Sequence, residues 1–319
     1  MTVHRSSSAT VVLAVLATIG GLAWGNAAVA ASRWGAGYFP NVLLTTQDGT
    51  VVRFYDDLLK GKTVAINVMF TDCKEVCPLQ TARLVQLKRL LGDRVGRDIF
   101  FYSISIDPER DLPGVLRAYA EKFGAGGPGW LFLTGKPEDV SLVTKKLGLV
   151  RSTDGSERDA HSTIFLVGHE ATGQWMRAST LDNPRFLAPR MGAFLGWRDT
   201  GPAKSYAEAR PLVLSGARYL FDNRCGVCHS VGDGDKVGPD LRDVTLRRDR
   251  AWLTRDIQAP DQVLATGDPI ATALFHKYKQ VRMPNLRLAS DEVAALLSYL
   301  EERSNALREE PRKGAAHVH

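Results

Sequence analysis

The sequence predicts two folded parts, an α/β domain followed by an all-α domain. Three observations lead to this prediction. The chain has 319 residues, which is long enough for two hydrophobic cores. Apolar runs of strand length alternate with helical patterns in the first two thirds, whereas the remainder carries helical patterns. The four cysteines form two local pairs, Cys73 with Cys77 and Cys225 with Cys228, one in each part.

The patterns divide the chain into five segments. They are a signal peptide at 1–30, the α/β domain at 33–197, a linker at 198–211, the all-α domain at 212–306 and a disordered tail at 307–319. The linker is short and contains turn residues. The net charge of +6 is mild and is spread through the chain, so we expect no nucleic-acid partner.

The first 30 residues have the features of a secretory signal peptide. His4 and Arg5 precede a short apolar run at 9–23, and an A-x-A sequence follows at 28–30. We expect cleavage after Ala30 and a periplasmic mature protein. The apolar run is shorter than the roughly 20 residues of a membrane-spanning helix, which favours a signal peptide. An uncleaved anchor is the alternative, and only this anchor would attach the protein to a membrane.

In the first domain, predicted strands and predicted helices alternate. A Gln-Asp-Gly turn at 47–49 predicts a hairpin. The run at 63–70 is nearly all apolar, as expected of a central strand covered on both faces. Further strands are predicted at 99–106, 130–133, 163–167 and 174–178, and helices at 79–91, 113–123, 137–147 and 183–195. Parallel strands followed by a closing hairpin give the order of thioredoxin-like folds.

Cys73 and Cys77 lie in the loop between the strand at 63–70 and the helix at 79–91. Pro78 suits a helix start, where its missing N–H leaves no hydrogen bond unmade. The free N–H groups of the first helical turn favour a thiolate over a thiol. The pair therefore predicts either dithiol redox chemistry or a site for a soft metal, Cu(I) or zinc.

A third ligand for a metal is expected to be a histidine. The mature first domain has two, His161 and His169, at the two ends of the strand at 163–167. A strand of five residues is roughly 16 Å long, so at most one of them can reach the cysteines. In a thioredoxin-like sheet this strand runs antiparallel to the strand at 63–70. His161 is then placed near the cysteine loop and His169 at the far end.

Three motifs resemble the Sco (SenC) family: T-D-C-K-E-V-C-P at 71–78, S-I-S-I-D-P-E-R-D at 103–111 and D-A-H-S-T-I-F-L-V at 159–167. Its members are thioredoxin-like, periplasmic or mitochondrial copper proteins that help to assemble the copper-A centre of cytochrome c oxidase. The resemblance implies copper ligation by Cys73, Cys77 and His161. It also implies a supporting role for Asp107, which could equally be a turn residue before Pro108.

The second domain carries the sequence Cys-Gly-Val-Cys-His at 225–229. C-x-x-C-H is the attachment motif for haem c, in which the two thiols bind the vinyl groups and the histidine binds the iron. A zinc site or a disulfide is the alternative. Met283 is the only methionine after residue 191, and it precedes Pro284 in a loop that suits a second axial ligand. His276 is the weaker candidate.

This domain resembles a class I cytochrome c over its whole length. The Gly-Pro-Asp-Leu sequence at 238–241 stands where small cytochromes c carry a turn on the proximal side, and a closing helix is predicted from Ser290 to about residue 303. The resemblance implies thioether links at Cys225 and Cys228 and axial ligation by His229 and Met283. A methionine ligand raises the reduction potential, which suits electron transfer.

Together these features predict a copper chaperone or thiol-disulfide reductase for oxidase assembly. Cys73 and Cys77 would act as copper ligands or, without metal, as the reactive dithiol, and the haem would exchange electrons with this centre. The expected partner is the oxidase subunit with the copper-A site or another periplasmic copper or redox protein. The alternatives are a dedicated electron carrier whose first domain only docks a partner, and a metal-independent thiol oxidoreductase or peroxidase.

Overall fold

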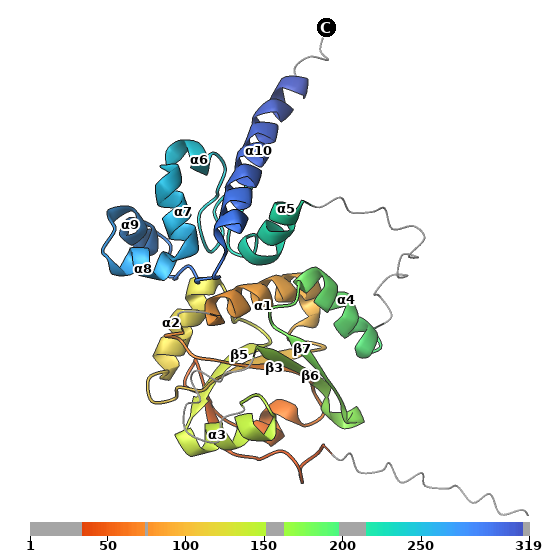
Figure 1. The fold of residues 1–319 in the computed structure, drawn as a ribbon. Helices are drawn as coiled ribbons and strands as arrows, with labels where there is room; N and C mark the ends of the chain where they lie inside the picture. Colours follow the sequence, from red (N-terminus) through yellow and green to blue (C-terminus); the bar gives the residue numbers. More distant parts are fainter. Residues whose placement is uncertain (1–33, 74–75, 151–162, 198–214, 315–319) are drawn as a thin grey trace, which may run out of the picture. The chain divides into compact units, whose positions relative to one another are not determined.

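The computed structural model describes residues 34–73, 76–150, 163–197 and 215–314 (Figure 1). The predicted signal peptide and linker lie outside these ranges. Within them, no helix combines the length and the apolar character that crossing a membrane requires.

A seven-stranded sheet forms the N-terminal part of the structure, with the order β2-β1-β5-β4-β3-β6-β7. The strands are β1 (Leu43–Thr46), β2 (Val51–Arg53), β3 (Thr63–Met69), β4 (Phe100–Ser105), β5 (Trp130–Gly135), β6 (Ile164–His169) and β7 (Gln174–Ser179). Strands β3, β4 and β5 are parallel, whereas β6 runs antiparallel to β3, and β7 runs antiparallel to β6. The predicted thioredoxin-like arrangement is confirmed.

The predicted hairpin around Gly49 is present and is formed by β1 and β2. Gly49 has a φ of 81°, a conformation that glycine adopts without strain. β1 also pairs antiparallel with β5 and so extends the main sheet. The sequence did not predict this position, because pairing between strands far apart in the chain leaves no local signal.

Helices cover both faces of the sheet. They are α1 (Cys77–Leu91), α2 (Pro113–Phe123), α3 (Pro137–Lys146) and α4 (Pro184–Phe194), with a π-helical turn η1 (Phe54–Leu59) and short 3-10 turns η2 (Gly92–Arg94) and η3 (Glu170–Thr172). In Figure 1, α1 and α4 lie on one face and α3 on the other. Along β3, Ala65 and Met69 belong to the core under α1, whereas Val64 and Ile66 belong to the core on the α3 face. All seven residues of β3 are buried, so the loop that follows it starts from the centre of the sheet.

The C-terminal part is helical, as predicted. Its elements are α5 (Gly216–Leu220), the π-helical turn η5 (Phe221–Cys225), α6 (Val244–Arg247), α7 (Arg250–Gln258), α8 (Pro260–Ala265), α9 (Pro269–Lys277) and α10 (Ser290–Gly314). Phe221, Leu253, Leu296 and Leu300 form the centre of its core. α10 therefore packs on both η5 and α7.

Helix α10 continues past Leu307, where the sequence predicted the start of a disordered tail. That prediction is wrong for residues 307–314. Leu307 packs against the core of the C-terminal part, and the guanidinium of Arg308 pairs with the Asp243 carboxylate. These contacts stabilise turns of the helix whose charged composition alone suggested disorder. Residues 315–319 lie outside the described residues.

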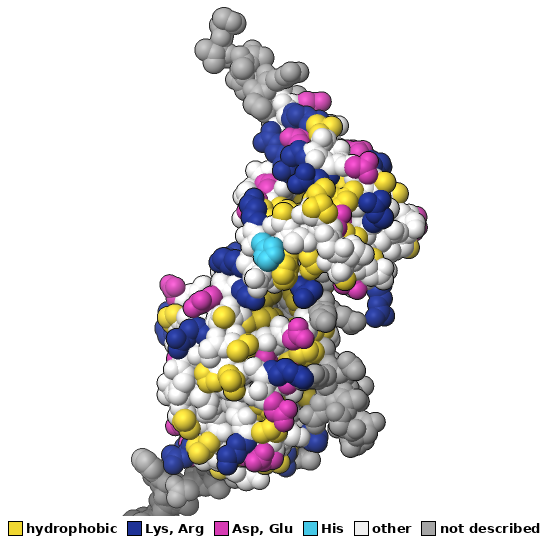
Figure 2. Space-filling model, turned by 90° about the vertical axis from the view of Figure 1, so that its left-hand side faces the viewer, with side chains coloured by type: hydrophobic (Ala, Val, Ile, Leu, Met, Phe, Trp, Pro, Cys, Tyr) yellow, Lys and Arg dark blue, Asp and Glu magenta, His cyan; other side chains and the backbone are white. Residues whose placement is uncertain are grey.

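The surface carries mixed charge. On the face drawn in Figure 2, Lys and Arg side chains and Asp and Glu side chains are both scattered, over the sheet-containing part and over the helical part. This agrees with the spread of charge along the sequence.

Candidate functional site

The loop after β3 brings the first two cysteines together. The backbone N–H of Cys77 donates to the Sγ of Cys73, with a distance of 3.3 Å from nitrogen to sulfur. The N–H of Cys73 donates to the carbonyl oxygen of Phe70, which ties the loop to the end of the strand. Both cysteines are free thiols, and both are buried. The two soft donors that the sequence paired are therefore adjacent in space.

Cys77 is the first residue of α1, yet its thiol is not favoured as a thiolate. Burial raises the pKa of the Cys77 thiol well above its ordinary value, and the neighbouring Cys73 adds to the shift. The sequence-based expectation that the helix start favours a thiolate is therefore wrong for the metal-free protein. The loss of water around a fully buried sulfur outweighs the partial charge of the first helical turn.

A carboxylate that the sequence did not single out joins the end of β4 to the start of the cysteine loop. Asp111 accepts hydrogen bonds from the Thr71 hydroxyl at 2.5 Å and the Thr71 N–H at 3.1 Å. It also accepts one from the Ser105 hydroxyl at 2.5 Å. Burial raises the pKa of Asp111 above its ordinary value, although these hydrogen bonds oppose the shift.

Asp107, the acid named from the sequence, organises the turn that follows β4. Its backbone N–H donates to the Ser105 hydroxyl at 3.0 Å, and its carbonyl oxygen accepts from the N–H groups of Arg110 and Asp111. Its carboxylate lies 3.2 Å from the Arg110 guanidinium. These contacts fit the turn-residue interpretation of Asp107.

Gln80 lies one helical turn after Cys77 and is fully buried. Among the described residues, neither its Oε1 nor its Nε2 atom has a hydrogen-bond partner. On α1 its neighbours at helical spacing are Cys77, Leu84 and Leu87, all of them buried as well. Within the part of the chain that the structure describes, α1 therefore carries an unsatisfied amide on its apolar face, one helical turn from a thiol.

The strand register tests the argument about the two histidines. His169 pairs with Thr63, at the end of β3 that is remote from the cysteine loop. Its ring accepts a hydrogen bond from the Thr172 N–H at 3.2 Å, so it caps a turn. The predicted antiparallel direction of β6 is confirmed. His161 lies outside the described residues, and within them no group of three or more His, Cys, Asp or Glu side chains is arranged to hold a metal ion.

The second cysteine pair closes a tight turn at the end of η5. The N–H groups of Cys228 and His229 both donate to the carbonyl oxygen of Cys225, at 3.0 and 2.9 Å. Burial raises the pKa of Cys225 and of Cys228 to about 12, so both are neutral thiols in the haem-free chain. This turn places the two sulfurs and the imidazole on the wall of a single cavity.

The ring of His229 is fixed by the turn that follows it. Its Nδ1 lies 2.9 Å from the carbonyl oxygen of Pro239, which can only accept, so Nδ1 carries the proton and the Nε2 lone pair is available. Burial lowers the pKa of His229, which favours the neutral imidazole. Gly238 leaves room for the ring, because a Cβ there would lie 2.6 Å from its Cε1. The proximal turn implied by the cytochrome resemblance is therefore present.

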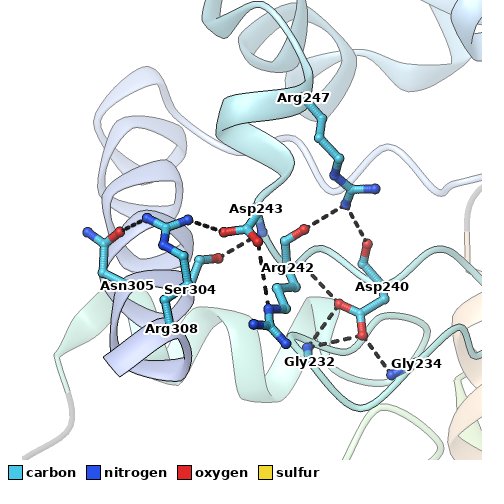
Figure 3. A network of polar contacts seen from close by, with 9 residues as sticks. All are labelled: Gly232, Gly234, Asp240, Arg242, Asp243, Arg247, Ser304, Asn305 and Arg308. Carbon is cyan, nitrogen blue, oxygen red and sulfur yellow. Dashed lines mark hydrogen bonds and ion pairs between the residues drawn. The ribbon is translucent and has the colours of Figure 1, made fainter. Parts of the chain in front are cut away.

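Asp240 anchors this turn through its carboxylate (Figure 3). It accepts hydrogen bonds from the backbone N–H groups of Gly232, Gly234 and Arg242, at 2.6 to 3.0 Å. Burial disfavours the charged form, but these donors outweigh it and hold the pKa of Asp240 at about 2. Arg247 donates to the carbonyl oxygens of Asp240 and Arg242 and so ties the turn to α6.

The same network reaches the last helix. The backbone N–H of Asp243 donates to the Ser304 hydroxyl at 3.0 Å, and the Asp243 carboxylate pairs with Arg308, as Figure 3 shows. Arg308 also donates to the side-chain oxygen of Asn305. The proximal turn is thus held by α6 on one side and by α10 on the other.

The cavity of the C-terminal part measures about 270 Å³, and both Cys225 and Met283 line it. Its remaining wall is largely apolar, with Leu253, Leu264, Phe275 and Leu296. His276, the weaker candidate for an axial ligand, is exposed and is not among the lining residues. Two thiols, a neutral imidazole and a thioether around one apolar cavity form a donor set that suits a covalently attached haem.

The loop that carries Met283 is fixed to α8. The Asn285 side-chain amide donates to the Asp261 carboxylate at 2.8 Å, and its oxygen accepts from the Arg287 N–H at 2.9 Å. Pro284 limits the backbone freedom between these contacts and Met283. The thioether is therefore held by a constrained loop, as the sequence predicted.

Two polar groups lie near the cavity, the Trp252 indole and the Asp256 carboxyl. The Trp252 indole N–H donates to the Asp268 carboxylate at 3.1 Å, and Asp268 also caps α9. Asp256 lines the cavity, and burial together with the charge of Asp268 raises its pKa to about 6. Both residues lie on α7, and only the tertiary structure shows that Asp256 faces a buried environment.

Comparisons with known protein families match two regions of the chain. The family model SCO1/SenC matches residues 39–189, and the model for cytochrome c matches residues 215–304. The two regions contain the first and the second cysteine pair, respectively.

Individual relatives match part of the chain. The chain is 33% identical over 128 residues to the SCO1 protein homolog of Bacillus subtilis, an alignment that spans 38% of this chain and 64% of that protein. It is 30% identical over 147 residues to the SCO2-like protein of Rickettsia felis, spanning 44% of this chain and 68% of the relative. The chain thus spans just under two thirds of the B. subtilis relative.

Solved structures match about half of the chain. A SCO1/SenC family lipoprotein from Bacillus anthracis is 27% identical, with a TM-score of 0.42, and the match covers 51% of this chain and 98% of that one. ScoI of Bradyrhizobium japonicum, solved with copper bound, is 25% identical with a TM-score of 0.39, and the match covers 48% and 96% of the two chains.

Proposed function

We propose a function from the premise that the chain belongs to the SCO1/SenC family and carries a cytochrome c domain. The protein would be a periplasmic copper chaperone or thiol-disulfide reductase for assembly of the copper centre of cytochrome c oxidase. Its haem c domain would exchange electrons with the copper or dithiol centre. The observation that carries the proposal is the contact between the Cys77 N–H and the Cys73 sulfur at the end of β3.

Cys73 and Cys77 would bind copper as thiolates, with His161 as the third ligand. Because burial raises the pKa of the Cys77 thiol, copper must displace a firmly held proton, so binding strengthens as the pH rises. The same burial lowers the reactivity of the metal-free dithiol, since the thiolate is the nucleophile. The C-x3-C spacing and the presence of His161 favour the copper role over a metal-independent oxidoreductase or peroxidase.

In the second domain, Cys225 and Cys228 would hold the haem covalently, with His229 and Met283 as axial ligands. A bound haem supplies one-electron transfer. The hydrogen bond from His229 to Pro239 orients the imidazole, and the apolar wall excludes water from the cavity. Copper(I) and copper(II) differ by one electron, so a single haem is matched to the redox change of one bound copper.

The test uses the full chain purified from a host that attaches haem c. Cys73→Ser should abolish stoichiometric copper binding while the haem content is retained, whereas Asp72→Asn, at the exposed neighbouring position, should leave both unchanged. Anaerobic addition of Cu(I) to the oxidised wild type should reduce the haem. Undiminished copper binding by Cys73→Ser would overturn the copper site, and an electron carrier that only docks a partner would bind no copper.

A further inference from the structure

Asp111 is a buried carboxylate in the turn between β4 and α2, with 1% of its surface exposed. It lies next to the cysteine loop without being part of it. Its partners come from two places in the fold. Thr71 follows the end of β3, and Ser105 is the last residue of β4. Asp111 therefore connects the ends of the two parallel strands at the centre of the sheet.

Two of the hydrogen bonds to Asp111 come from Thr71, at the start of the loop that carries Cys73. Thr71 contributes both its hydroxyl and its backbone N–H, so its main chain and its side chain are fixed together. Cys73 follows two residues later, and its N–H donates back to Phe70. With Thr71 fixed, little rotational freedom remains between the strand and the Cys73 sulfur.

A carboxylate suits this position. Three donors converge on Asp111, two from Thr71 and one from Ser105, and an ionised carboxylate is an acceptor at both oxygens. An asparagine would direct its own N–H₂ group toward one of these groups, so a hydroxyl would have to accept where it now donates. Burial of an acid without such partners would be strongly unfavourable, so the three hydrogen bonds are the reason that the carboxyl group is tolerated here.

We propose that Asp111 is the positioning residue of the thiol site: by fixing Thr71, it holds the Cys73 sulfur within reach of Cys77 for metal binding and for disulfide formation. The metal-binding half of this inference rests on the proposed function. The Asp107 carboxylate, for which the sequence left a supporting role and a turn role equally open, pairs with Arg110 in the neighbouring turn.

The test measures two quantities on the haem-loaded full chain: the Cu(I) affinity, by competition with a Cu(I) chelator, and the equilibrium constant for disulfide formation against glutathione. In Asp111→Asn we expect the Cu(I) affinity to fall by about 10- to 100-fold, as found for residues that orient metal ligands. The disulfide equilibrium should shift in the same variant. Thr71→Val, which removes only the hydroxyl donor, should show a smaller change in the same direction.

Glu109→Gln is the matched control, because it removes an exposed carboxylate two positions away. It should change neither quantity. If Asp111→Asn fails to fold, Thr71→Val alone tests whether Asp111 positions the thiol site. If Thr71→Val and any folded Asp111→Asn chain retain the wild-type Cu(I) affinity and disulfide equilibrium, Asp111 is only a structural residue and the inference is wrong.

A failure of the proposed function gives a different result. In that case the wild type itself shows no Cu(I) binding that depends on Cys73, whereas the disulfide equilibrium still reports on Asp111. A shift of that equilibrium in Asp111→Asn, absent in Glu109→Gln, would then support the positioning role without copper.

Discussion

The Nδ1 atom of His229 lies 2.9 Å from the carbonyl oxygen of Pro239, and Gly238 lies directly against the same ring. The first contact sets the tautomer, and the second leaves the space that the ring occupies. Neither residue is in the C-x-x-C-H motif. The motif therefore supplies the ligand, and the turn nine to ten residues later in the sequence orients it.

Gly238→Ala should disturb this orientation. The added Cβ would lie 2.6 Å from the His229 Cε1, so the ring must move. We expect a change in the haem absorption spectrum and a loss of about 1–3 kcal/mol in the free energy of unfolding, as for other overpacked sites. Gly216→Ala is the control, since no atom lies within 4 Å of its added Cβ. A wild-type spectrum for Gly238→Ala would contradict the proposed ligand.

Met283→Ala should lower the reduction potential of the haem, because a thioether ligand raises it. The fall should be a substantial part of the roughly 0.8 V range that axial ligands span. Potentiometric titration followed by absorbance measures it. His276→Gln serves as the control, because this histidine is exposed and does not line the cavity. If His276→Gln lowers the potential and Met283→Ala does not, the assignment of the second axial ligand is wrong.

Gln80→Leu should stabilise the protein. The Gln80 amide is fully buried, and among the described residues it has no hydrogen-bond partner. Replacing it with an apolar side chain of similar size removes a desolvation cost of about 1–3 kcal/mol. Denaturant unfolding of the copper-free chain measures the change.

The same substitution at Gln47 provides the contrast. Gln47 is also buried, but its oxygen accepts from the Phe132 N–H at 2.9 Å and its amide donates to Asp48 at 3.0 Å. Gln47→Leu leaves the buried Phe132 N–H without this acceptor, so it should destabilise the fold by about 1–3 kcal/mol. Equal destabilisation by the two variants would show that Gln80 is satisfied in solution.

Asp256 should make stability depend on pH. Its pKa is about 6 in the folded protein, against an ordinary value of 3.8. At a pH between 3.8 and about 6, the Asp256 carboxyl is protonated in the folded chain and ionised in the unfolded chain. The contribution of Asp256 is therefore fully present below a pH of about 4 and is lost as the pH rises through about 6.

Asp256→Asn cannot ionise and should avoid this loss. We expect its melting temperature to exceed that of the wild type at neutral pH, and to match it at a pH below about 4. Asp233→Asn, at an exposed position, should follow the wild type at both pH values. Thermal unfolding of the haem-loaded protein over this pH range is the measurement. If the melting temperature of Asp256→Asn exceeds that of the wild type by the same amount in acid as at neutral pH, the cause is not the ionisation of Asp256.

Much of the fold could be predicted because the signals are local. The apolar run at 63–70 became β3 (Thr63–Met69), and the helix predicted at 113–123 was found as α2 (Pro113–Phe123). The direction of β6 followed from the fold class, and it placed His169 beside Thr63. The tail prediction failed, because α10 is stabilised by Leu307 and Arg308 through contacts with distant residues.

The sequence by itself determined the order of strands and helices in the α/β domain, the two cysteine pairs and the candidate ligands, because periodicity and short motifs are properties of neighbouring residues. Only the tertiary structure decided the environment of those ligands. Asp111 fixes Thr71 across 40 positions of sequence, since β3 and β4 end side by side. The buried thiol of Cys77 holds its proton despite the helix start, because desolvation depends on all the atoms packed around the sulfur.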